Sequence, residues 1–218
     1  MAAFSKELAL ACSSALSHLR HRLFWYLLAL LLVAASALLL LPHDAAWSQS
    51  QRALDPTWTP LARKLSFWGD YLTGTVPVAA LLFLMGRLLS RPAWKRAALA
   101  CLLAASLAGL SANVLCFTLG RPRPCTSLPD GFYGPSHFGK YDYRSFPSGH
   151  SATSFGTATA VAVALPELGL PCLIFAGGVA WSRVELGRHF PSDVFVGAAL
   201  GIAFGIAFGS GARSGARR

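Results

Sequence analysis

Two imidazoles, a carboxylate and an arginine stand in two short motifs of this chain, at spacings that could support phosphoryl transfer. The first motif is the run Phe-Pro-Ser-Gly-His at residues 146–150, which ends on His150. In the second, Arg183 is followed after five residues by His189 and after three more by Asp193. An imidazole can attack phosphorus or carry a proton, and an arginine can stabilise charge on a phosphoryl group. Together these groups predict phosphoryl transfer that needs neither a metal ion nor a cofactor.

The residues in and near these motifs suggest how an anion would be held. Ser148 and Gly149 stand where a loop is expected to become a helix, so that free backbone N–H groups and the helix dipole can face a negative charge. The lack of a side chain at Gly149 lets the backbone come close, and Ser148 can donate its hydroxyl. Arg123 and Arg183 can each grip two phosphoryl oxygens. We expect these four residues to bind a phosphate group.

The composition places the motifs in a membrane protein. Hydrophobic residues make up 54% of the 218 residues and charged residues only 13%, whereas soluble domains carry about 25% charged residues. In a soluble protein the net charge of +10 would raise the question of nucleic acid. Here the cations cluster at the ends of apolar stretches, which indicates membrane orientation and contact with anionic lipid. We therefore expect the bilayer, and no nucleic acid, as a partner.

Six apolar segments are expected to be transmembrane helices, so the predicted fold is an all-α, six-helix bundle forming one domain over residues 1–218, with the active site at the ends of helices 3 to 6. The first segment has 19 residues, which favours a retained helix over a signal peptide, whose apolar region has about 7–15. The last three are short but end in a motif, where polar backbone can be buried in protein. The segments are Leu23–Leu41, Tyr71–Leu89, Ala97–Leu119, Ala152–Leu165, Leu170–Leu186 and Val194–Phe208.

Two further patterns concern the surroundings of these helices. A polar stretch between the first two segments contains Trp47, Trp58 and Trp68, which we interpret as anchors at the membrane interface. Glycine recurs at every fourth residue of the last segment, at positions 197, 201, 205 and 209. Small residues at this spacing let another helix approach closely. We therefore assign these glycines to packing and not to phosphate binding.

The distribution of Lys and Arg predicts the orientation in the membrane. With a cytoplasmic N-terminus, ten cations fall inside and nine outside, and six of those nine lie in or beside the motifs, where chemistry explains them. Only Arg52, Arg63 and Lys64 then count against the arrangement. We expect six spans, both termini in the cytoplasm and every motif on the outer side, which in a bacterial inner membrane is the periplasmic side.

The two motifs resemble those of the type-2 phosphatidic acid phosphatase family, the integral-membrane branch of a superfamily that includes glucose-6-phosphatase, bacterial acid phosphatases and vanadium haloperoxidases. The family pattern has three parts: Lys, six residues and Arg-Pro; then Pro-Ser-Gly-His; then Ser-Arg, five residues, His, three residues and Asp. The second and third parts match in full, and Arg123-Pro124 fits the end of the first. The resemblance covers about residues 115–201.

The resemblance implies a phosphohistidine mechanism. His189 would attack phosphorus, and His150 would protonate the leaving oxygen and then activate the water that resolves the intermediate. Asp193, four residues beyond His189, would lie on the same helical face, hold the tautomer of His189 and stabilise its positive charge. We therefore expect these three residues to be catalytic and the four phosphate-binding residues named above to surround them.

The first part of the family pattern departs at its lysine. Counting back seven residues from Arg123 reaches Cys116, and no nearby register supplies a lysine. Arg121, Lys140 or Arg144 could compensate, and we retain Arg121 and Cys116 as accessory site residues. An apolar setting raises the pKa of a thiol, which favours an inert Cys116 over a nucleophile. The five cysteines show no CxxC spacing, so neither a disulfide framework nor a zinc site is indicated.

These observations predict a membrane lipid phosphatase that hydrolyses a phosphate monoester or pyrophosphate at the outer face. Motifs at the ends of transmembrane helices meet head groups whose tails stay in the bilayer, and phosphatidic acid, phosphatidylglycerol phosphate, undecaprenyl pyrophosphate and lipid A are the substrates considered. Transfer of the phosphoryl group to a second lipid would use the same residues and is the main alternative. A non-catalytic lipid-binding protein is a further alternative, which the intact His150, His189 and Asp193 disfavour.

Overall fold

The computed structural model describes residues 31–44, 46–47, 56–137 and 139–214. Within these ranges the regular elements are helices, and extended backbone pairs only in an isolated bridge between Arg121 and Arg144. This confirms the all-α class. Residues 31–39 belong to one compact unit and residues 40–214 to another. The residues of both motifs lie in the second unit.

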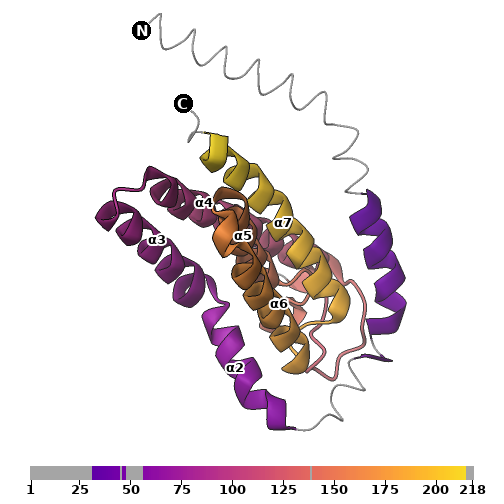
Figure 1. Ribbon diagram of the computed structural model, residues 1–218. Coiled ribbons are helices and arrows are strands. Elements are labelled where there is room, and N and C mark those ends of the chain that lie inside the picture. Colours follow the sequence, from indigo (N-terminus) through magenta and orange to yellow (C-terminus); the bar gives the residue numbers. More distant parts are fainter. Residues whose placement is uncertain (1–30, 45, 48–55, 138, 215–218) are drawn as a thin grey trace, which may run out of the picture. The chain divides into compact units, whose positions relative to one another are not determined.

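Five helices build the main body of the second unit (Figure 1), and α5 lies at its centre. Helix α5 packs against α4, α6 and α7, and α3 packs against α4. Ten residues of α5 are buried, and all are Gly, Ala, Ser or Thr except Val161. Such small side chains let several helices approach one central helix closely. The helices are α3 (Val76–Leu88), α4 (Pro92–Leu119), α5 (Gly149–Ala164), α6 (Gly169–Glu185) and α7 (Pro191–Ser214).

Short elements connect these helices. Before α3 come η1 (Pro56–Trp58), α2 (Thr59–Trp68) and η2 (Tyr71–Thr75), a single π-helical turn that runs directly into α3. The loop between α4 and α5 contains the 3-10 turns η3 (Gly134–His137) and η4 (Tyr141–Tyr143), and η5 (Pro166–Leu168) joins α5 to α6.

Helix α2 was absent from the expected elements, because its residues lie in the stretch interpreted as a polar connection with tryptophan anchors. Pro60 occupies the first turn of α2, where its missing N–H is tolerated, and Ala62 and Ser66 are buried. The helix packs against α6. It thereby brings Ser66 to Arg183 of the second motif, a contact that no sequence pattern predicted.

Among the residues that the structure describes, three helical stretches are long and apolar enough to cross a membrane: Tyr71–Leu88, Pro92–Leu119 and Pro191–Arg213. Helices α5 and α6, with 16 and 17 residues, correspond to the expected fourth and fifth spans. Of the expected first span, residues 23–30 lie outside the described residues, and a helix covers Leu31–Asp44. Leucines such as Leu84, Leu99 and Leu110 are exposed on these helices, as expected of side chains that face lipid. The count of six spans stays a prediction.

The glycines of α7 pack directly against α5, as the sequence predicted. A Cβ atom at Gly197 would lie 2.4 Å from the carbonyl oxygen of Ser148, and one at Gly201 would lie 2.5 Å from that of Ala152. Real Cβ atoms do not approach so closely, so any larger residue would push the two helices apart. Because Ser148 begins α5, this packing also fixes the first motif against the start of α7.

Candidate active site

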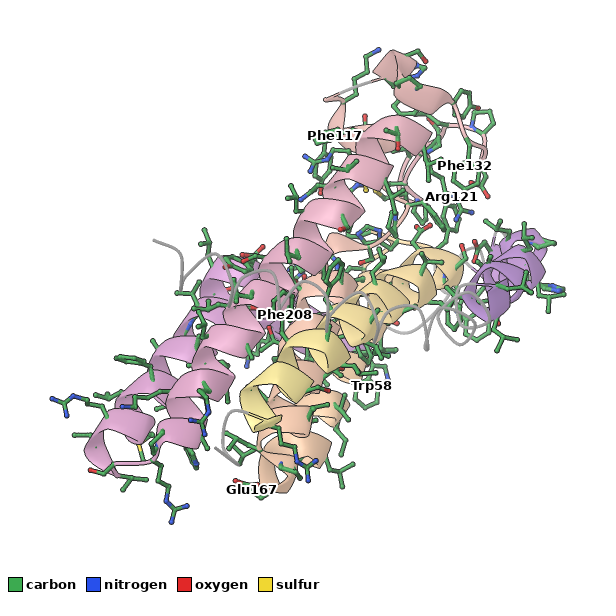
Figure 2. All side chains as sticks on the ribbon, turned by 90° about the horizontal axis from the view of Figure 1, so that it is seen from above. Trp58, Phe117, Arg121, Phe132, Glu167 and Phe208 are labelled. Atoms are coloured by element: carbon green, nitrogen blue, oxygen red, sulfur yellow. The ribbon has the colours of Figure 1, made fainter. Side chains whose placement is uncertain are left out.

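Four helix ends carry the motif residues to one end of the bundle. Helix α4 ends at Leu119 and α6 at Glu185, while α5 begins at Gly149 and α7 at Pro191. Gly120 caps α4 in the left-handed conformation, and a Cβ atom there would lie 2.3 Å from the carbonyl oxygen of Gly134. Figure 2 shows Arg121 at this end of the bundle and Glu167 at the other.

Backbone hydrogen bonds hold the first arginine segment against the segment that precedes α5. The N–H of Ser145 donates to the carbonyl oxygen of Arg121 (3.0 Å), and the N–H of Arg123 donates to that of Asp142 (2.8 Å). The N–H of Ser148 donates to the carbonyl oxygen of Asp193 (2.9 Å). These bonds join the three parts of the motif pattern into one framework, although the parts lie up to 70 residues apart in the sequence.

A cavity of about 300 Å³ lies within this framework. It brings together five residues that the sequence had singled out for chemistry or phosphate binding, and Cys116 with them. The five are Arg123, Gly149, His150, Arg183 and His189. A Cβ atom added at Gly149 would meet open space, so the lack of a side chain leaves that volume to a ligand. Ser148, Asp193 and Arg121 do not line the cavity.

Ser148 acts as the N-cap of α5. Its side chain is completely buried, and its hydroxyl oxygen accepts a hydrogen bond from the N–H of Ser151 (3.4 Å) and lies 3.2 Å from the hydroxyl of the same residue. Capping satisfies one of the free N–H groups at the start of the helix. The hydroxyl oxygen thus accepts within the helix, and Ser148 does not line the cavity, so the phosphate contact expected from the sequence stays a prediction.

His189 is held so that one ring nitrogen is free for chemistry. Its Nδ1 lies 2.7 Å from the carbonyl oxygen of Ser145 and 3.7 Å from Oδ2 of Asp193. Because a carbonyl oxygen can only accept, Nδ1 must carry the proton and Nε2 is unprotonated in the neutral ring. Burial lowers the pKa of His189, the Asp193 carboxylate opposes this shift, and Arg183 and Arg123 add to it. The imidazole is thus kept neutral and able to attack.

Asp193 supports His189 from behind, and it does so in a different way from the one predicted. Its Oδ2 accepts hydrogen bonds from the backbone N–H of Phe190 (2.8 Å) and the hydroxyl of Ser145 (2.5 Å). The short bond that sets the tautomer of His189 goes to the Ser145 carbonyl, so Asp193 contributes mainly a fixed negative charge. That charge would stabilise an imidazolium or a phosphorylated imidazole.

Arg121 is completely buried and does not line the cavity. Its guanidinium is bound by three carboxylates. It donates to Asp193 Oδ1 (2.7 Å), to Asp44 Oδ2 (2.9 Å) and to both oxygens of Asp130 (2.8 and 2.7 Å), and it lies over the ring of Phe190. The accessory role in phosphate binding is therefore not supported by its position. Arg121 instead anchors Asp193.

Arg123 and Arg183 face the cavity with unused donors. Arg123 stacks on the ring of Tyr141, 3.9 Å from its centre, and donates from Nη1 to the Tyr141 hydroxyl (2.9 Å). Arg183 donates from Nη1 to the Ser66 hydroxyl. The Nε atoms of both arginines are buried, and neither has a hydrogen-bond partner within the described part of the chain. Such groups are costly to leave unpaired, and a bound anion would satisfy them.

His150 lies beside a carboxylate that the sequence did not indicate. Its Nε2 is 3.8 Å from Oδ2 of Asp70, which also lines the cavity and caps the π-turn η2 by accepting from the N–H of Leu72 (3.0 Å). Asp70 belongs to no motif and lies 80 residues before His150, so only the packing of η2 against α5 brings the two together. The one sequence signal for this contact was that Asp70 directly precedes the apolar segment that begins at Tyr71.

Cys116 lies at the position of the family lysine and borders the cavity. Its side chain is buried, and its Sγ is 3.3 Å from the carbonyl oxygen of Pro147, to which the thiol donates. Arg144, considered from the sequence as a compensating cation, also lines the cavity, and other cavity residues missed from the sequence are Tyr71, Gly109, Asn113, Tyr141 and Thr153. In the ranges that the structure describes, no three His, Cys, Asp or Glu side chains are grouped to hold a metal ion.

Comparison with known proteins agrees with this geometry. The family model of the PAP2 superfamily matches residues 94–211, more than half of the chain. The lipid A 1-phosphatase of Rhizobium etli is 37% identical over 94 residues, which are 43% of this chain and 40% of that protein. The decaprenylphosphoryl-5-phosphoribose phosphatase of Mycolicibacterium smegmatis is 36% identical over 138 residues, which are 62% of this chain and 69% of that protein. The match to the Rhizobium relative thus spans about two fifths of its length.

Two solved structures are similar to the fold. The first transmembrane PAP2-type phosphatidylglycerolphosphate phosphatase from Bacillus subtilis matches with a TM-score of 0.58 and 25% identity, over 84% of this chain and 91% of that one. Aquifex aeolicus LpxE matches with a TM-score of 0.53 and 27% identity, over 75% and 92% of the two chains. Together with the three apolar helices, these matches identify an integral membrane protein.

Proposed function

This chain belongs to the PAP2 superfamily, and we propose that it removes phosphate from a lipid phosphate by way of a phosphohistidine intermediate. The observation that carries the proposal is the one cavity that holds His150, His189, Arg123 and Arg183 together. An attacking group, a proton carrier and donors that stabilise negative charge are what phosphoryl transfer requires.

In the first step, Nε2 of His189 attacks phosphorus and the bond from phosphorus to the leaving oxygen breaks. The 2.7 Å contact of Nδ1 with the Ser145 carbonyl supports this role, because it leaves the lone pair on Nε2. Arg123 and Arg183 would hold the phosphoryl oxygens through their free N–H groups, and the backbone at Gly149 would approach them from the start of α5. Asp193 would stabilise the positive charge that develops on the imidazole.

In the same step, His150 gives a proton to the leaving oxygen, and in the second step it takes a proton from the water that attacks phosphohistidine. The second step releases inorganic phosphate and restores neutral His189. Burial and the charges of Arg183, His189 and Arg123 lower the pKa of His150 to about 3. The negative charges of a bound phosphoryl group and of Asp70, whose Oδ2 lies 3.8 Å from Nε2 of His150, would oppose that shift and favour the protonated form that the first step needs. This assignment makes Asp70 a positioning residue for the proton carrier.

The substrate we propose is a lipid whose phosphate reaches the cavity while its tail stays in the bilayer. The similar proteins named above are, by their names, phosphatases of lipid A, of a decaprenyl-linked phosphoribose and of phosphatidylglycerol phosphate. The site lies where candidate spans end, next to α4 and α7. A lipid phosphate monoester therefore fits better than a soluble phosphate ester.

We propose that this end of the bundle faces the outer side of the membrane. Arg87, Arg91, Lys95 and Arg96 lie at the opposite end, around the turn between α3 and α4, where Arg96 also donates to the carbonyl oxygen of Ala212 near the end of α7 (3.1 Å). Cations gather on the cytoplasmic side of membrane proteins. This arrangement supports a site on the outer side and a cytoplasmic end of α7, and the proposal keeps six spans with both termini in the cytoplasm.

The activity is tested by phosphate release from purified protein against phosphatidic acid, phosphatidylglycerol phosphate, lipid A and undecaprenyl pyrophosphate, with EDTA present throughout. His189→Ala should lose activity by on the order of 10⁴-fold or more, while the matched control His137→Ala should not. His137 is half-buried in the loop before α5, where its ring stacks on Tyr143, and it does not line the cavity. No release from any lipid by wild-type protein, or equal activity in His189→Ala, would refute the proposal. Loss of lipid phosphate without free phosphate would indicate transfer to a second lipid.

The orientation is tested with an impermeant thiol reagent on intact cells. In a Cys125→Ser background, which removes the exposed cysteine near the site, Gly131→Cys should be labelled and Pro92→Cys should not. A side chain fits at Gly131, because its Cβ atom would meet only Tyr133, at an ordinary 3.6 Å. The reverse pattern would place the site on the cytoplasmic side, whatever the reaction is.

A further inference from the structure

Arg144 places a third guanidinium in the wall of the cavity. Its Nη2 donates to Oδ1 of Asn113 (2.8 Å), one turn before Cys116 on α4, and its guanidinium carbon lies 4.9 Å from the centre of the Phe117 ring. A hydrogen bond and an aromatic face thus fix the orientation of a long side chain that would otherwise be free to move.

The unused donor of Arg144 points to a ligand. Four buried side-chain polar atoms have no hydrogen-bond partner in the part of the chain that the structure describes, and three of them are the Nε atoms of Arg123, Arg144 and Arg183. All three arginines line the same cavity. A group that satisfies all three must carry several acceptor oxygens and negative charge, as a phosphoryl group does.

We propose that Arg144 is a phosphate-binding residue of this site and supplies the cation that position 116 does not. The inference rests on the proposed function and names the third ligand of its phosphoryl group. Cys116 borders the same cavity and is neutral as a thiol, and Asn113 holds Arg144 one helical turn away from it. The positive charge is therefore supplied by Arg144 from the loop between α4 and α5, and Asn113 of α4 holds that side chain in place.

Neither of the other two cations considered from the sequence can take this place. Arg121 does not line the cavity; besides the three carboxylates, its guanidinium donates to the Ser192 hydroxyl and lies over the rings of Phe132 and Phe190. Lys140 is exposed and does not line the cavity. The bridge between residues 121 and 144 and the bond from Arg123 N–H to the Asp142 carbonyl hold the Arg123 and Arg144 segments side by side.

The test compares Arg144→Ala with Lys140→Ala, a cation removed from the same loop outside the cavity. We expect Arg144→Ala to lower kcat/KM by about 10²–10³-fold and to raise the concentration of orthovanadate needed for inhibition by at least about ten-fold, with an unchanged Tm. Lys140→Ala should behave as wild type in all three measurements. Equal kinetics and equal vanadate inhibition in the two variants would overturn the proposal.

A second variant identifies the role of the charge. Cys116→Lys, introduced into Arg144→Ala, should regain at least about ten-fold in kcat/KM, because an ammonium at position 116 would face the same cavity. No recovery in a folded double variant would mean that Arg144 does not stand in for a cation at that position. If Arg144→Ala does not fold, Arg144→Gln removes the charge with less loss of packing and is measured in its place.

A direct binding measurement separates this inference from the reaction itself. Inorganic phosphate should raise the Tm of wild-type protein, and of His189→Ala, more than that of Arg144→Ala. This result is expected even if no lipid in the panel is hydrolysed. A failure of the proposed function would therefore appear as missing hydrolysis with the difference in Tm retained. An equal increase for wild type and Arg144→Ala would count against Arg144 alone.

Discussion

Arg121 and Arg123 are two residues apart in the sequence, but their side chains lie in opposite environments. Arg121 is fully buried and donates to Asp44, Asp130 and Asp193, whereas Arg123 has an aromatic ring and one hydroxyl as partners and keeps a buried Nε unpaired. Burial by itself would lower the pKa of Arg121, but the three carboxylates more than reverse this and raise it. The pKa of Arg123 is lowered by its burial.

The difference separates an arginine that builds the site from one that we propose binds the ligand. A guanidinium surrounded by carboxylates has no donor or net charge to offer an anion, and it serves instead to fix Asp193 behind His189. A guanidinium buried against neutral partners keeps its charge and its donors for a ligand. The same distinction places Arg144 and Arg183 with Arg123.

The largest effect is expected from removing the carboxylate-bound arginine. Arg121→Met would leave Asp44 and Asp193 buried without their counter-charge, and breaking a buried ion pair costs about 3–5 kcal/mol, a large share of the about 5–15 kcal/mol that keeps a domain folded. We expect little folded protein, measured as the yield of monodisperse protein in detergent and as Tm. Asp130→Asn, at a partner whose side chain is 32% exposed, should cost less than about 1 kcal/mol. A fully stable Arg121→Met protein would contradict the structural role.

The next effect is on the reaction and not on folding. Arg123→Ala and Arg183→Ala should each lower kcat/KM by about 10²–10³-fold, as expected for the loss of a transition-state donor, without a lower Tm. Ser66→Ala should lower kcat/KM by only about five-fold, because it removes one neutral hydrogen bond to Arg183, worth about 1 kcal/mol. If Arg123→Ala loses stability as Arg121→Met does, the two arginines do not differ as described.

The sequence did not predict the different roles of Arg121 and Arg123, although it predicted much of the site. The motifs and the family resemblance that they carry predicted that His150, His189, Arg123, Arg183 and Gly149 form one site, because fixed spacing sets the geometry within each motif and the resemblance implied that the motifs meet. The glycines at every fourth residue of α7 predicted close approach of another helix, and the structure identifies that helix as α5. Nothing in the spacing of residues 121 and 123 indicates which arginine meets carboxylates, since Asp44 and Asp193 come from residues 77 and 72 positions away.

Long-range packing also explains the other differences. Ser66 reaches Arg183 only because α2 packs against α6. The sequence of α2 is polar enough that it was interpreted as a connection and not as a helix. Asp70 reaches His150 through the π-turn η2, a local irregularity without a clear sequence signature. The tautomer of His189 is set by a backbone carbonyl, which side-chain motifs cannot report.

A smaller effect is expected in the pH dependence of kcat/KM. Arg121 acts on the cavity indirectly there, because it holds Asp193 beside His189. Burial lowers the pKa of His189 and Asp193 opposes that shift, so the neutral nucleophile persists below the ordinary histidine value of about 6.5. The acid limb of kcat/KM should therefore have its midpoint below pH 6.5. In Asp193→Asn the opposing charge is gone, and the midpoint should move to still lower pH as the maximal rate falls. A limb that stays in place in this variant would report ionisation of the substrate and not of His189.

The smallest effect is expected at Cys116, the uncharged member of the cavity wall. Its thiol is buried and donates to the Pro147 carbonyl at 3.3 Å, an interaction that a serine hydroxyl can replace. If Arg144 carries the missing charge and His189 is the nucleophile, Cys116→Ser should change kcat by less than about two-fold, since one neutral donor replaces another. Steady-state kinetics on the preferred lipid, with Tm as the control for folding, measure this directly. A folded Cys116→Ser protein without activity, together with protection of that thiol from alkylation by substrate, would instead make Cys116 the attacking group. That outcome would remove His189 from the centre of the mechanism and leave the three arginines as the phosphate site of a cysteine-dependent enzyme.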